Sequence, residues 1–268
     1  MSHPEVSVVI PTLNRRQRIS RAIDSVRRQS RPADEILVVD DGSTDDTAGF
    51  VAVAYPDVQV LRQESRGVSA ARNAGIRAAQ GALIAFLDSD DEWLPRKLER
   101  QLQAMRESPG ALLCHTDEIW IRNGRRVNPM KKHQKFGGRI FEKALPLCVI
   151  SPSSVLVDRR LFDEVGLFDE RLPACEDYDL WLRVCARFPV LFVDEPLIVK
   201  HGGHEDQLSR RHWGMDRFRI QALRKILAEP DLPDDYRRAA EAMLARKVEI
   251  FARGARKREL ESLHAPQP

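Results

Sequence analysis

Apolar runs that end in acidic residues set the strongest limit on how this 268-residue chain can fold. Two aspartates follow the apolar run 35–39, and two more follow the run 82–87. These four residues are Asp40, Asp41, Asp88 and Asp90. A strand that is apolar at every position is buried on both faces, as in α/β sheets, and such sheets bind ligands beyond the carboxyl ends of their strands. The sequence therefore predicts an α/β fold with a carboxylate-rich ligand site.

Strand-like and helix-like segments alternate along the first part of the chain. An apolar strand at 6–10 precedes apolar residues that recur on one helix face from Ile19 to Val26. A short strand is expected at 58–61 and an alanine-rich helix at about 68–80. Such alternation predicts a parallel sheet with right-handed crossovers. We expect a doubly wound, mostly parallel central sheet flanked by helices.

The second half of the chain has a weaker pattern. Asn123-Gly124 lies between apolar segments and indicates a β-hairpin, whereas residues 129–150 show no strong period and are interpreted as loop-rich. A helix is expected from Tyr178 to Phe188. We predict one domain over residues 1–210, with halves that meet near residue 110, and a helical extension over residues 211–268.

Composition narrows the class of protein. The chain is 31% charged and 43% hydrophobic, and no apolar run approaches the roughly 20 residues of a membrane span. Its start resembles no signal segment, so we expect a cytoplasmic protein. A net charge of +3 is too small to indicate a nucleic-acid partner. The four cysteines form no Cys-x-x-Cys pair, so reduced, packed thiols are expected.

Two segments are locally basic. Seven arginines lie between residues 15 and 31; they form a solvated helix face or attract anionic lipid or a phosphorylated acceptor. The C-terminal helix has an apolar stripe from Tyr236 to Phe251, which packs on its own domain or docks peripherally at a membrane or partner. The cations that we expect to remain available to anions there are Arg237, Arg238, Arg246, Lys247, Arg253, Arg256, Lys257 and Arg258.

Asp88 and Asp90 predict a metal-dependent site. One carboxylate can bind Mg²⁺ or Mn²⁺ while the other reaches sugar or ribose hydroxyls. A helix cap would explain one aspartate here but not three in the four residues 88–91. Because crowded carboxylates repel one another, we expect a divalent cation that holds a phosphate-bearing ligand.

The turn after the second strand suggests a base-binding site. Asp40 or Asp41, accepting a hydrogen bond from a pyrimidine ring N–H, would select uracil or thymine over cytosine. The alternative is a plain turn at Gly42 followed by a helix cap. Arg72 is expected either to meet the base or a phosphate or to form a surface salt bridge.

Glu176 and Asp177 begin a predicted helix and supply a candidate general base. A carboxylate can remove a proton from a hydroxyl nucleophile, and we prefer Asp177 for this role. The alternative is an acidic residue that only stabilises the helix dipole. His201 and His204 lack a recognised metal-ligand spacing, so loop structure is favoured over contact with a metal or diphosphate.

Five segments together resemble the motifs of family 2 glycosyltransferases, in order and in spacing. They are VVIPTLNR (8–15), VDDGSTD (39–45), AARNAG (70–75), FLDSDD (86–91) and EDYDLW (176–181). The resemblance covers roughly residues 5–200. It implies the nucleotide-diphospho-sugar transferase (GT-A) fold, with a nucleotide-binding half to about residue 110 and an acceptor half after it.

The resemblance also implies a reaction, which is sugar transfer with inversion by direct displacement of a nucleoside diphosphate. The donor would be a nucleotide-sugar, and the acceptor a carbohydrate or lipid-linked hydroxyl in bacterial-type polysaccharide or glycolipid assembly. The implied nucleoside pocket is Pro11, Thr12, Asp40, Asp41 and Arg72. Asp88 would face the ribose and the donor sugar. Asp90 would bind the metal, together with Asp88. Asp177 would be the general base. Leu13 and residues 115–150 carry no side chain that identifies the sugar.

Two other classes of function compete with this interpretation. One is a nucleotide-sugar-binding module without catalysis, against which the presence of Asp90 and Asp177 argues. The other is a phosphatase or nucleotidyltransferase. An aspartyl phosphatase needs Asp-x-Asp-x-Thr after the first strand, where this chain has Pro11-Thr12, and no Gly-rich basic phosphate loop is present.

Overall fold

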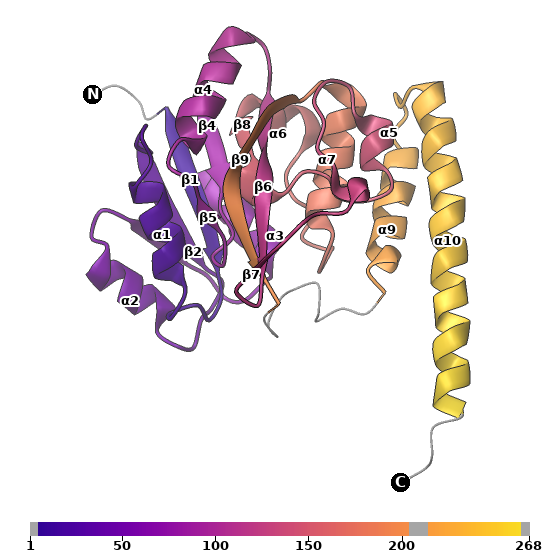
Figure 1. Cartoon of the computed structure of the whole chain (residues 1–268), viewed down its shortest axis with the longest axis horizontal. Coiled ribbons are helices and arrows are strands. Elements are labelled where there is room, and N and C mark those ends of the chain that lie inside the picture. The colour runs from indigo at the N-terminus through magenta and orange to yellow at the C-terminus, as the bar shows by residue number, and fades with distance from the viewer. Residues whose placement is uncertain (1–4, 204–213, 264–268) are drawn as a thin grey trace.

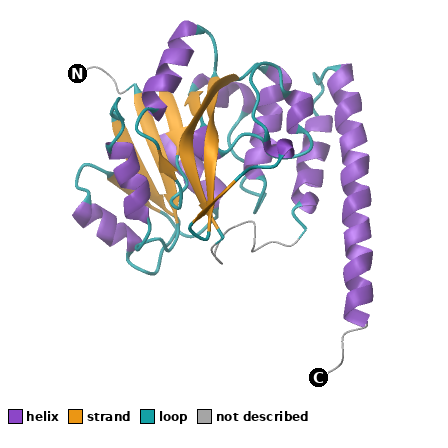
Figure 2. Ribbon diagram, viewed as in Figure 1, coloured by secondary structure: helices purple, strands orange, loops and turns teal. Residues whose placement is uncertain are grey.

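The structure is a computed structural model that describes residues 5–203 and 214–263. A twisted sheet runs through the molecule with helices on both of its faces (Figure 1). The long final helix lies at the end of the molecule far from the first strands, as Figure 2 shows with helices and strands in separate colours. The predicted α/β architecture with a helical C-terminal extension is confirmed.

The first half of the sheet is parallel, as predicted. Its strands are β1 (Val6–Thr12), β2 (Glu35–Asp40), β3 (Gln59–Arg62) and β4 (Leu83–Phe86), in the spatial order β3-β2-β1-β4. The helices α1 (Ile19–Arg27), α2 (Thr47–Ala54) and α3 (Val68–Ala78) connect them. Because parallel strands share a direction, their carboxyl ends meet at one edge, where Thr12 lies opposite Asp40.

The second half of the sheet mixes strand directions. It contains β8 (Leu156–Asp158), β6 (Leu113–Arg122), β9 (Leu191–Gly202) and β5 (Glu92–Trp93), in that order after β4. Strands β6 and β9 are parallel to each other, whereas β4 with β8, β8 with β6, and β9 with β5 are antiparallel. The predicted hairpin at Asn123 is confirmed, because β7 (Arg125–Val127) folds back on β6.

Strand β9 corrects one expectation. His201 lies in this strand together with Lys200, so the loop that the sequence predicts at His201 is wrong. Pro196 interrupts the apolar pattern, and the pairing with β6 shifts register around Asp117, opposite that proline. A bulge thus absorbs a residue that cannot donate a ladder hydrogen bond. His204 lies outside the described residues.

The remaining helices include two short elements within residues 129–150, a segment that the sequence predicts to be loop-rich. They are α4 (Lys97–Glu107), α5 (Phe141–Ala144), α6 (Arg160–Val165), α7 (Glu176–Arg187), α9 (Asp216–Leu227) and α10 (Asp234–Leu263), with 3₁₀ turns η1 (Lys131–His133) and η2 (Pro152–Ser154). Helix α6 ends at Gly166, whose φ of 75° is left-handed and suits a residue without a Cβ. Helix α7 begins at Glu176, so the predicted carboxylates lie at a helix N-terminus.

Two apolar cores lie on the two faces of the sheet. Alternate residues of β1 belong to different cores: Val9 lies in the core that also contains residues of α3, α7 and α9, whereas Val8 and Ile10 lie in the core that contains residues of α1 and α4. Gly75 of α3 makes the first contact possible, because a Cβ there would lie 2.3 Å from Val9 Cγ1. The helix can therefore lie close against the sheet only with glycine at this position.

Helix α10 packs on the protein through its first turns. The Tyr236 ring stacks on Phe141 with centroids 4.5 Å apart, and Ala240 is fully buried. Arg237 donates to two backbone carbonyls at the end of α9, and Lys247 Nζ lies 2.9 Å from Asp216 Oδ1. These two cations are thus not available to anions, contrary to the sequence expectation.

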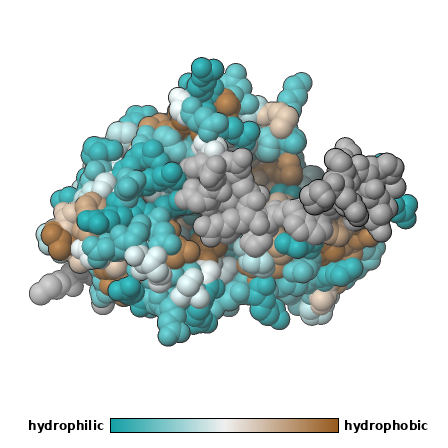
Figure 3. Space-filling model, turned by 90° about the horizontal axis from the view of Figure 1, so that it is seen from below, coloured by the Kyte–Doolittle hydropathy of each residue, from teal (hydrophilic) through white to brown (hydrophobic). Residues whose placement is uncertain are grey.

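The surface seen from below is mainly hydrophilic, with scattered hydrophobic areas (Figure 3). The most exposed large hydrophobic residues of the described chain include Val53, Met130, Val248 and Ile250. Among the described helices, none combines the length and apolar character that a membrane crossing requires. Docking of α10 at a membrane surface stays a prediction from its sequence.

Replacement of Gly75 by alanine should lower stability, although alanine normally favours a helix interior. The added methyl group would overlap Val9, so we expect Gly75→Ala to reduce the free energy of unfolding by about 1–3 kcal/mol. Guanidinium denaturation measures this. Gly49→Ala is the matched control, because the three atoms nearest its new Cβ all belong to the exposed carboxylate of Asp46, which can move away. Equal effects at both positions would contradict this account of close packing.

Candidate active site

The strand ends bring most of the predicted site residues to one edge of the sheet. Thr12 ends β1 beside Asp40, the last residue of β2, and Pro11 precedes it within the strand. Asp88 follows the end of β4, the neighbour of β1 on its other side. Arg72 of α3 pairs with Glu176, and this ion pair holds the N-terminus of α7 at the same edge of the sheet. The predicted convergence of these residues is therefore present.

Asp40 and Asp41 play different parts in the turn after β2. Asp40 is fully buried, and its Oδ1 accepts from the backbone N–H and the hydroxyl of Ser43. Its Oδ2 has no hydrogen-bond partner among the described residues, and Arg62 Nε lies 3.6 Å away. Thr12 Oγ1 is likewise buried without a described partner. The end of β1 and β2 thus holds two polar atoms able to bind a ligand.

Asp41 is occupied by its own loop. Its Oδ1 accepts from Gln63 Nε2 at 2.7 Å and from the Arg66 backbone N–H at 2.9 Å. Its Oδ2 accepts from the Gly67 backbone N–H at 2.8 Å and the Ser65 hydroxyl at 3.3 Å. A carboxylate has about four acceptor positions, so these donors fill it. Asp41 orders the segment that leads into α3.

Arg72 is the centre of a buried ion-pair network. Its guanidinium lies 2.7 Å from Asp88 Oδ1 and 2.6 Å from Glu176 Oε1, and the side chain is 4% exposed. It also lies over the Phe168 ring, 5.2 Å from the centroid. Burial lowers the pKa of Arg72, but attraction to the two carboxylates outweighs burial and raises it. The surface salt bridge that the sequence left open is thus a buried one.

Asp91 adds a third carboxylate to the pair Asp88 and Asp90. It is buried, and it accepts from the Ser153 hydroxyl at 2.7 Å and from the His201 backbone N–H at 3.1 Å. Burial, together with the charges of Asp90 and Asp88, raises its pKa well above the usual value. The expected repulsion among these aspartates is therefore present. Asp91 also ties β9 to the end of β4.

Lys200 is a cation of the site that sequence reasoning missed. Its Nζ donates to Ser151 Oγ at 3.1 Å. Burial lowers its pKa, but attraction to surrounding carboxylates more than offsets this and raises it. Those carboxylates are Glu118, Asp91, Asp88 and Asp177. The residue went unpredicted because the strand that carries it, β9, was itself unpredicted. Its charge thus acts both on the aspartates that follow β4 and on the candidate base.

Glu118 forms a second buried polar cluster beside Lys200. It accepts from Ser151 at 2.6 Å and Trp120 Nε1 at 2.7 Å, and it lies 3.1 Å from Lys135 Nζ. Burial raises its pKa, but Lys200 and Lys135 outweigh burial and hold it at about 2. Glu118 therefore stays ionised. This cluster orders a segment in which the sequence showed no usable period.

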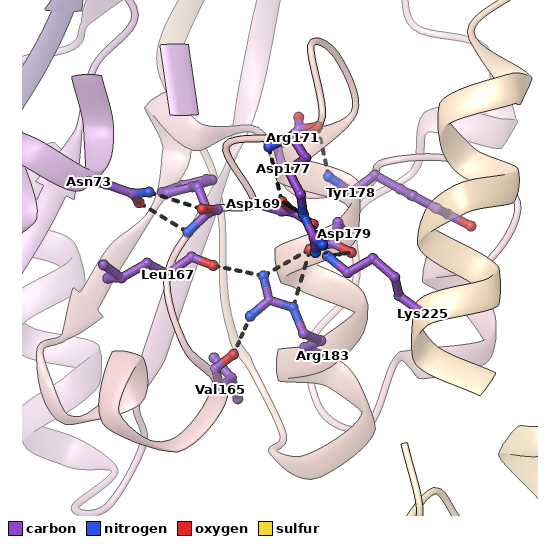
Figure 4. A network of polar contacts seen from close by, with 11 residues as sticks. Asn73, Val165, Leu167, Asp169, Arg171, Asp177, Tyr178, Asp179, Arg183 and Lys225 are labelled. Atoms are coloured by element: carbon purple, nitrogen blue, oxygen red, sulfur yellow. Dashed lines mark hydrogen bonds and ion pairs between the residues drawn. The ribbon is translucent and has the colours of Figure 1, made fainter. Parts of the chain in front are cut away.

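Asp177 is the second residue of α7 and is partly exposed. Its Oδ1 accepts from the Tyr178 backbone N–H at 2.7 Å, and its Oδ2 accepts from Cys148 Sγ at 3.2 Å. Figure 4 shows Asp177 beside Tyr178 at the start of the helix. Glu176 is buried and committed to Arg72, so Asp177 is the carboxylate of this pair that an outside hydroxyl can reach.

A polar network fixes the start of α7 from behind (Figure 4). Asp179 is buried between Arg183, at 2.9 Å, and Lys225, at 2.7 Å. Lys225 also pairs with Asp169 at 2.6 Å. Arg183 donates to the carbonyls of Val165 and Leu167, and Asn73 donates to that of Phe168. The loop before α7 is thereby held on three helices.

The donor set fits a divalent cation that shares its coordination with a phosphate ligand. Within the residues that the structure describes, no group of three or more His, Cys, Asp and Glu side chains is arranged to hold a metal alone. Mg²⁺ commonly uses one or two carboxylates and completes its shell with phosphate oxygens and water. Asp88 and Asp90 are partly exposed and offer such oxygens. The His201 ring instead lies 3.8 Å from Glu92.

Comparison with known proteins identifies relatives of the chain. The sequence model of glycosyl transferase family 2 matches residues 7–166. The chain is 35% identical over 182 residues to the UDP-Glc:alpha-D-GlcNAc-diphosphoundecaprenol beta-1,3-glucosyltransferase of Escherichia coli, which covers 67% of this chain and 69% of that protein. It is 34% identical over 185 residues to an uncharacterised glycosyltransferase of Rickettsia bellii, covering 68% of this chain. The chain spans only 26% of the length of that second relative.

Solved structures show the same fold. TarS 1–349 of S. aureus in complex with UDP-GlcNAc matches with a TM-score of 0.73 at 21% identity, covering 91% of this chain and 71% of that one. A mannosyltransferase of Pyrobaculum calidifontis in complex with GDP-Man and Mn²⁺ matches with a TM-score of 0.64 at 19% identity, covering 99% and 82%. The GT-A fold that the sequence resemblance implied is confirmed.

Removal of the Arg72 charge should be far more costly than removal of an exposed one. Arg72→Met leaves Asp88 and Glu176 without their common partner, so we expect a loss of about 3–5 kcal/mol in the free energy of unfolding. Arg66→Met is the control, because Arg66 pairs with Glu170 but is 66% exposed, and it should cost at most about 1 kcal/mol. Urea denaturation measures both. Similar losses would show that Arg72 is not the central ion pair.

Proposed function

Because the chain belongs to glycosyl transferase family 2, we propose that it transfers a sugar from a nucleoside-diphospho-sugar to a hydroxyl group, with inversion at the anomeric carbon. One observation carries this proposal. Arg72 pairs with both Asp88 and Glu176, which brings the base-bearing end of α7 beside the donor-side aspartates. A donor bound at the strand ends would thus have Asp177 within its neighbourhood.

The proposed nucleoside pocket lies at the ends of β1 and β2. Asp40 Oδ2 and Thr12 Oγ1 are buried polar atoms there that accept or donate no hydrogen bond within the described residues, so Asp40 is a better candidate than Asp41 for accepting a pyrimidine N–H. Pro11 would line the pocket, and Arg72 would border it. A UDP or dTDP donor fits this acceptor chemistry. The E. coli relative uses UDP-Glc by its name, and TarS binds UDP-GlcNAc, which supports the proposal.

The proposed cofactor is Mg²⁺ or Mn²⁺, held by Asp88 and Asp90. When bound, the metal would neutralise negative charge on the departing diphosphate. The Mn²⁺ in the Pyrobaculum relative's complex supports this assignment. Arg72 already neutralises part of Asp88, so the metal site would be completed only as the diphosphate arrives.

The proposed chemical step is a direct displacement. Asp177 Oδ2 takes the proton of the acceptor hydroxyl as its oxygen bonds to the anomeric carbon. The bond from that carbon to the diphosphate oxygen breaks, and its electron pair leaves with the diphosphate. The acceptor attacks the face opposite the leaving group, so the configuration inverts. Lys200 interacts electrostatically with both Asp88 and Asp177. Its positive charge would partly offset the negative charge that shifts from the base side to the diphosphate side during transfer.

The proposed acceptor is a carbohydrate or lipid-linked hydroxyl, and the process is assembly of a cell-surface polysaccharide or glycolipid. The acceptor named for the E. coli relative is a lipid diphosphate-linked sugar, and a Bacillus subtilis relative, 32% identical over 216 residues, is a putative teichuronic acid biosynthesis glycosyltransferase. We propose that the reaction takes place in the cytoplasm, with peripheral contact at the inner face of the membrane.

The direct test is Asp177→Asn assayed with a panel of nucleotide-sugars. The variant should keep nucleotide affinity while its transfer rate falls by about two to four orders of magnitude, since a positioned base contributes that much. Asp163→Asn, at an exposed position of α6, is the control and should transfer normally. Wild-type rates in Asp177→Asn would move the base to another residue, Glu176 first. Nucleotide binding without any transfer by the wild type would favour a non-catalytic binding module.

Nucleotide binding should depend on the metal. Asp88 and Asp90 would otherwise repel the diphosphate, so we expect calorimetry to show much weaker UDP binding in the presence of a chelator than with Mn²⁺. Equal affinity under both conditions would remove the metal-bridged site.

UDP or dTDP should bind more tightly than CDP if Asp40 accepts the ring N–H. Preference for GDP would contradict the pyrimidine pocket and leave the fold unaffected.

A further inference from the structure

Cys148 contacts the candidate base directly. Its Sγ lies 3.2 Å from Asp177 Oδ2 and 3.1 Å from the backbone carbonyl oxygen of Ile150. A thiol carries one proton and can donate to only one of these acceptors at a time. The other carboxylate oxygen of Asp177 already accepts from the Tyr178 backbone N–H. Within the part of the chain that the structure describes, the thiol is therefore the group that hydrogen-bonds to the second oxygen, Oδ2.

The segment that carries Cys148 is fixed on both sides. The Tyr178 hydroxyl of α7 donates to the Leu145 carbonyl at 2.6 Å, and Lys135 Nζ donates to the Val149 carbonyl at 2.8 Å. These bonds set the position of Cys148 relative to α7. The contact with Asp177 is thus built into the structure and does not depend on a freely moving loop.

The surroundings keep Cys148 in its thiol form. Burial raises its pKa well above the usual value, and the Asp177 carboxylate raises it further. The ionisable groups that act on Cys148 are Asp177, Lys135, Cys175, Tyr178 and Arg219. Asp177 in turn interacts electrostatically with Glu176 and with Lys200. Only a protonated sulfur can donate to a carboxylate, so burial preserves the contact.

We propose that Cys148 is a positioning residue for Asp177: its S–H holds Oδ2 in the empty enzyme and turns to the Ile150 carbonyl when the acceptor hydroxyl binds. The sulfur keeps one hydrogen bond in either orientation, so release of Oδ2 costs little. This inference rests on the proposed function, in which Asp177 is the base. It adds a residue outside all five sequence motifs to the catalytic arrangement.

The contact itself is tested without turnover. Alkylation of Cys148 by iodoacetamide, followed by mass spectrometry of the peptides, gives its reactivity as a function of pH. In Asp177→Asn the thiol loses a neighbouring negative charge, so its reactivity profile should move to lower pH. Cys185 is the internal control for opening of the fold, because it is fully buried and should stay unmodified in both proteins. An unchanged Cys148 profile would overturn the inference, whatever the protein is found to transfer.

The positioning role is tested by transfer kinetics. Cys148→Ala removes the donor that holds Oδ2 before the acceptor binds, so kcat/KM for the acceptor should fall about two- to tenfold, as loss of one hydrogen bond of modest net strength predicts, with donor KM unchanged. Cys148→Ser keeps a donor and should restore this ratio. A wild-type ratio in Cys148→Ala, or a serine variant as impaired as alanine, would overturn the role. A wild type without transfer would refute the proposed function and leave the alkylation result to decide the contact.

Discussion

The buried pairing of Arg72 with Asp88 and Glu176 is the interaction on which the candidate site depends. Each residue comes from a different part of the fold: Arg72 from α3, Asp88 from the end of β4, and Glu176 from the start of α7. A charge removed from water is tolerated only where partners with good geometry surround it. The position of α7, and hence of Asp177, is therefore fixed by the need to pair this guanidinium.

The sequence predicted the features that depend on neighbouring residues. Parallel strands, the Asn123 hairpin and the start of α7 follow from short-range apolar periodicity and turn chemistry, so the strand ends and their aspartates were found. The sequence did not predict the pairing of Arg72 with Glu176, because Glu176 lies 104 positions away along the chain. Strand β9 was missed because Pro196 breaks its apolar pattern, and Lys200 was missed with it.

The structure also revises the expected electrostatics. The sequence suggested that only a metal would offset the crowded carboxylates, but Arg72 and Lys200 already supply positive charge there. The aspartates also divide their tasks, since Asp41 orders its loop whereas Asp40 keeps a buried oxygen without a hydrogen bond from the described residues. In the proposed function, a metal would thus be left mainly with the charge of the incoming diphosphate.

A double-mutant cycle between Arg72 and Glu176 tests the central claim most directly. The free energies of unfolding of Arg72→Met, Glu176→Gln and the double variant are compared with that of the wild type. If Arg72 holds α7 to the strand ends, Glu176→Gln should destabilise the wild type but cost little once Arg72 is gone, with a coupling energy of about 1–3 kcal/mol. Effects that add to within about 0.5 kcal/mol would show that the two residues act independently and would contradict the account.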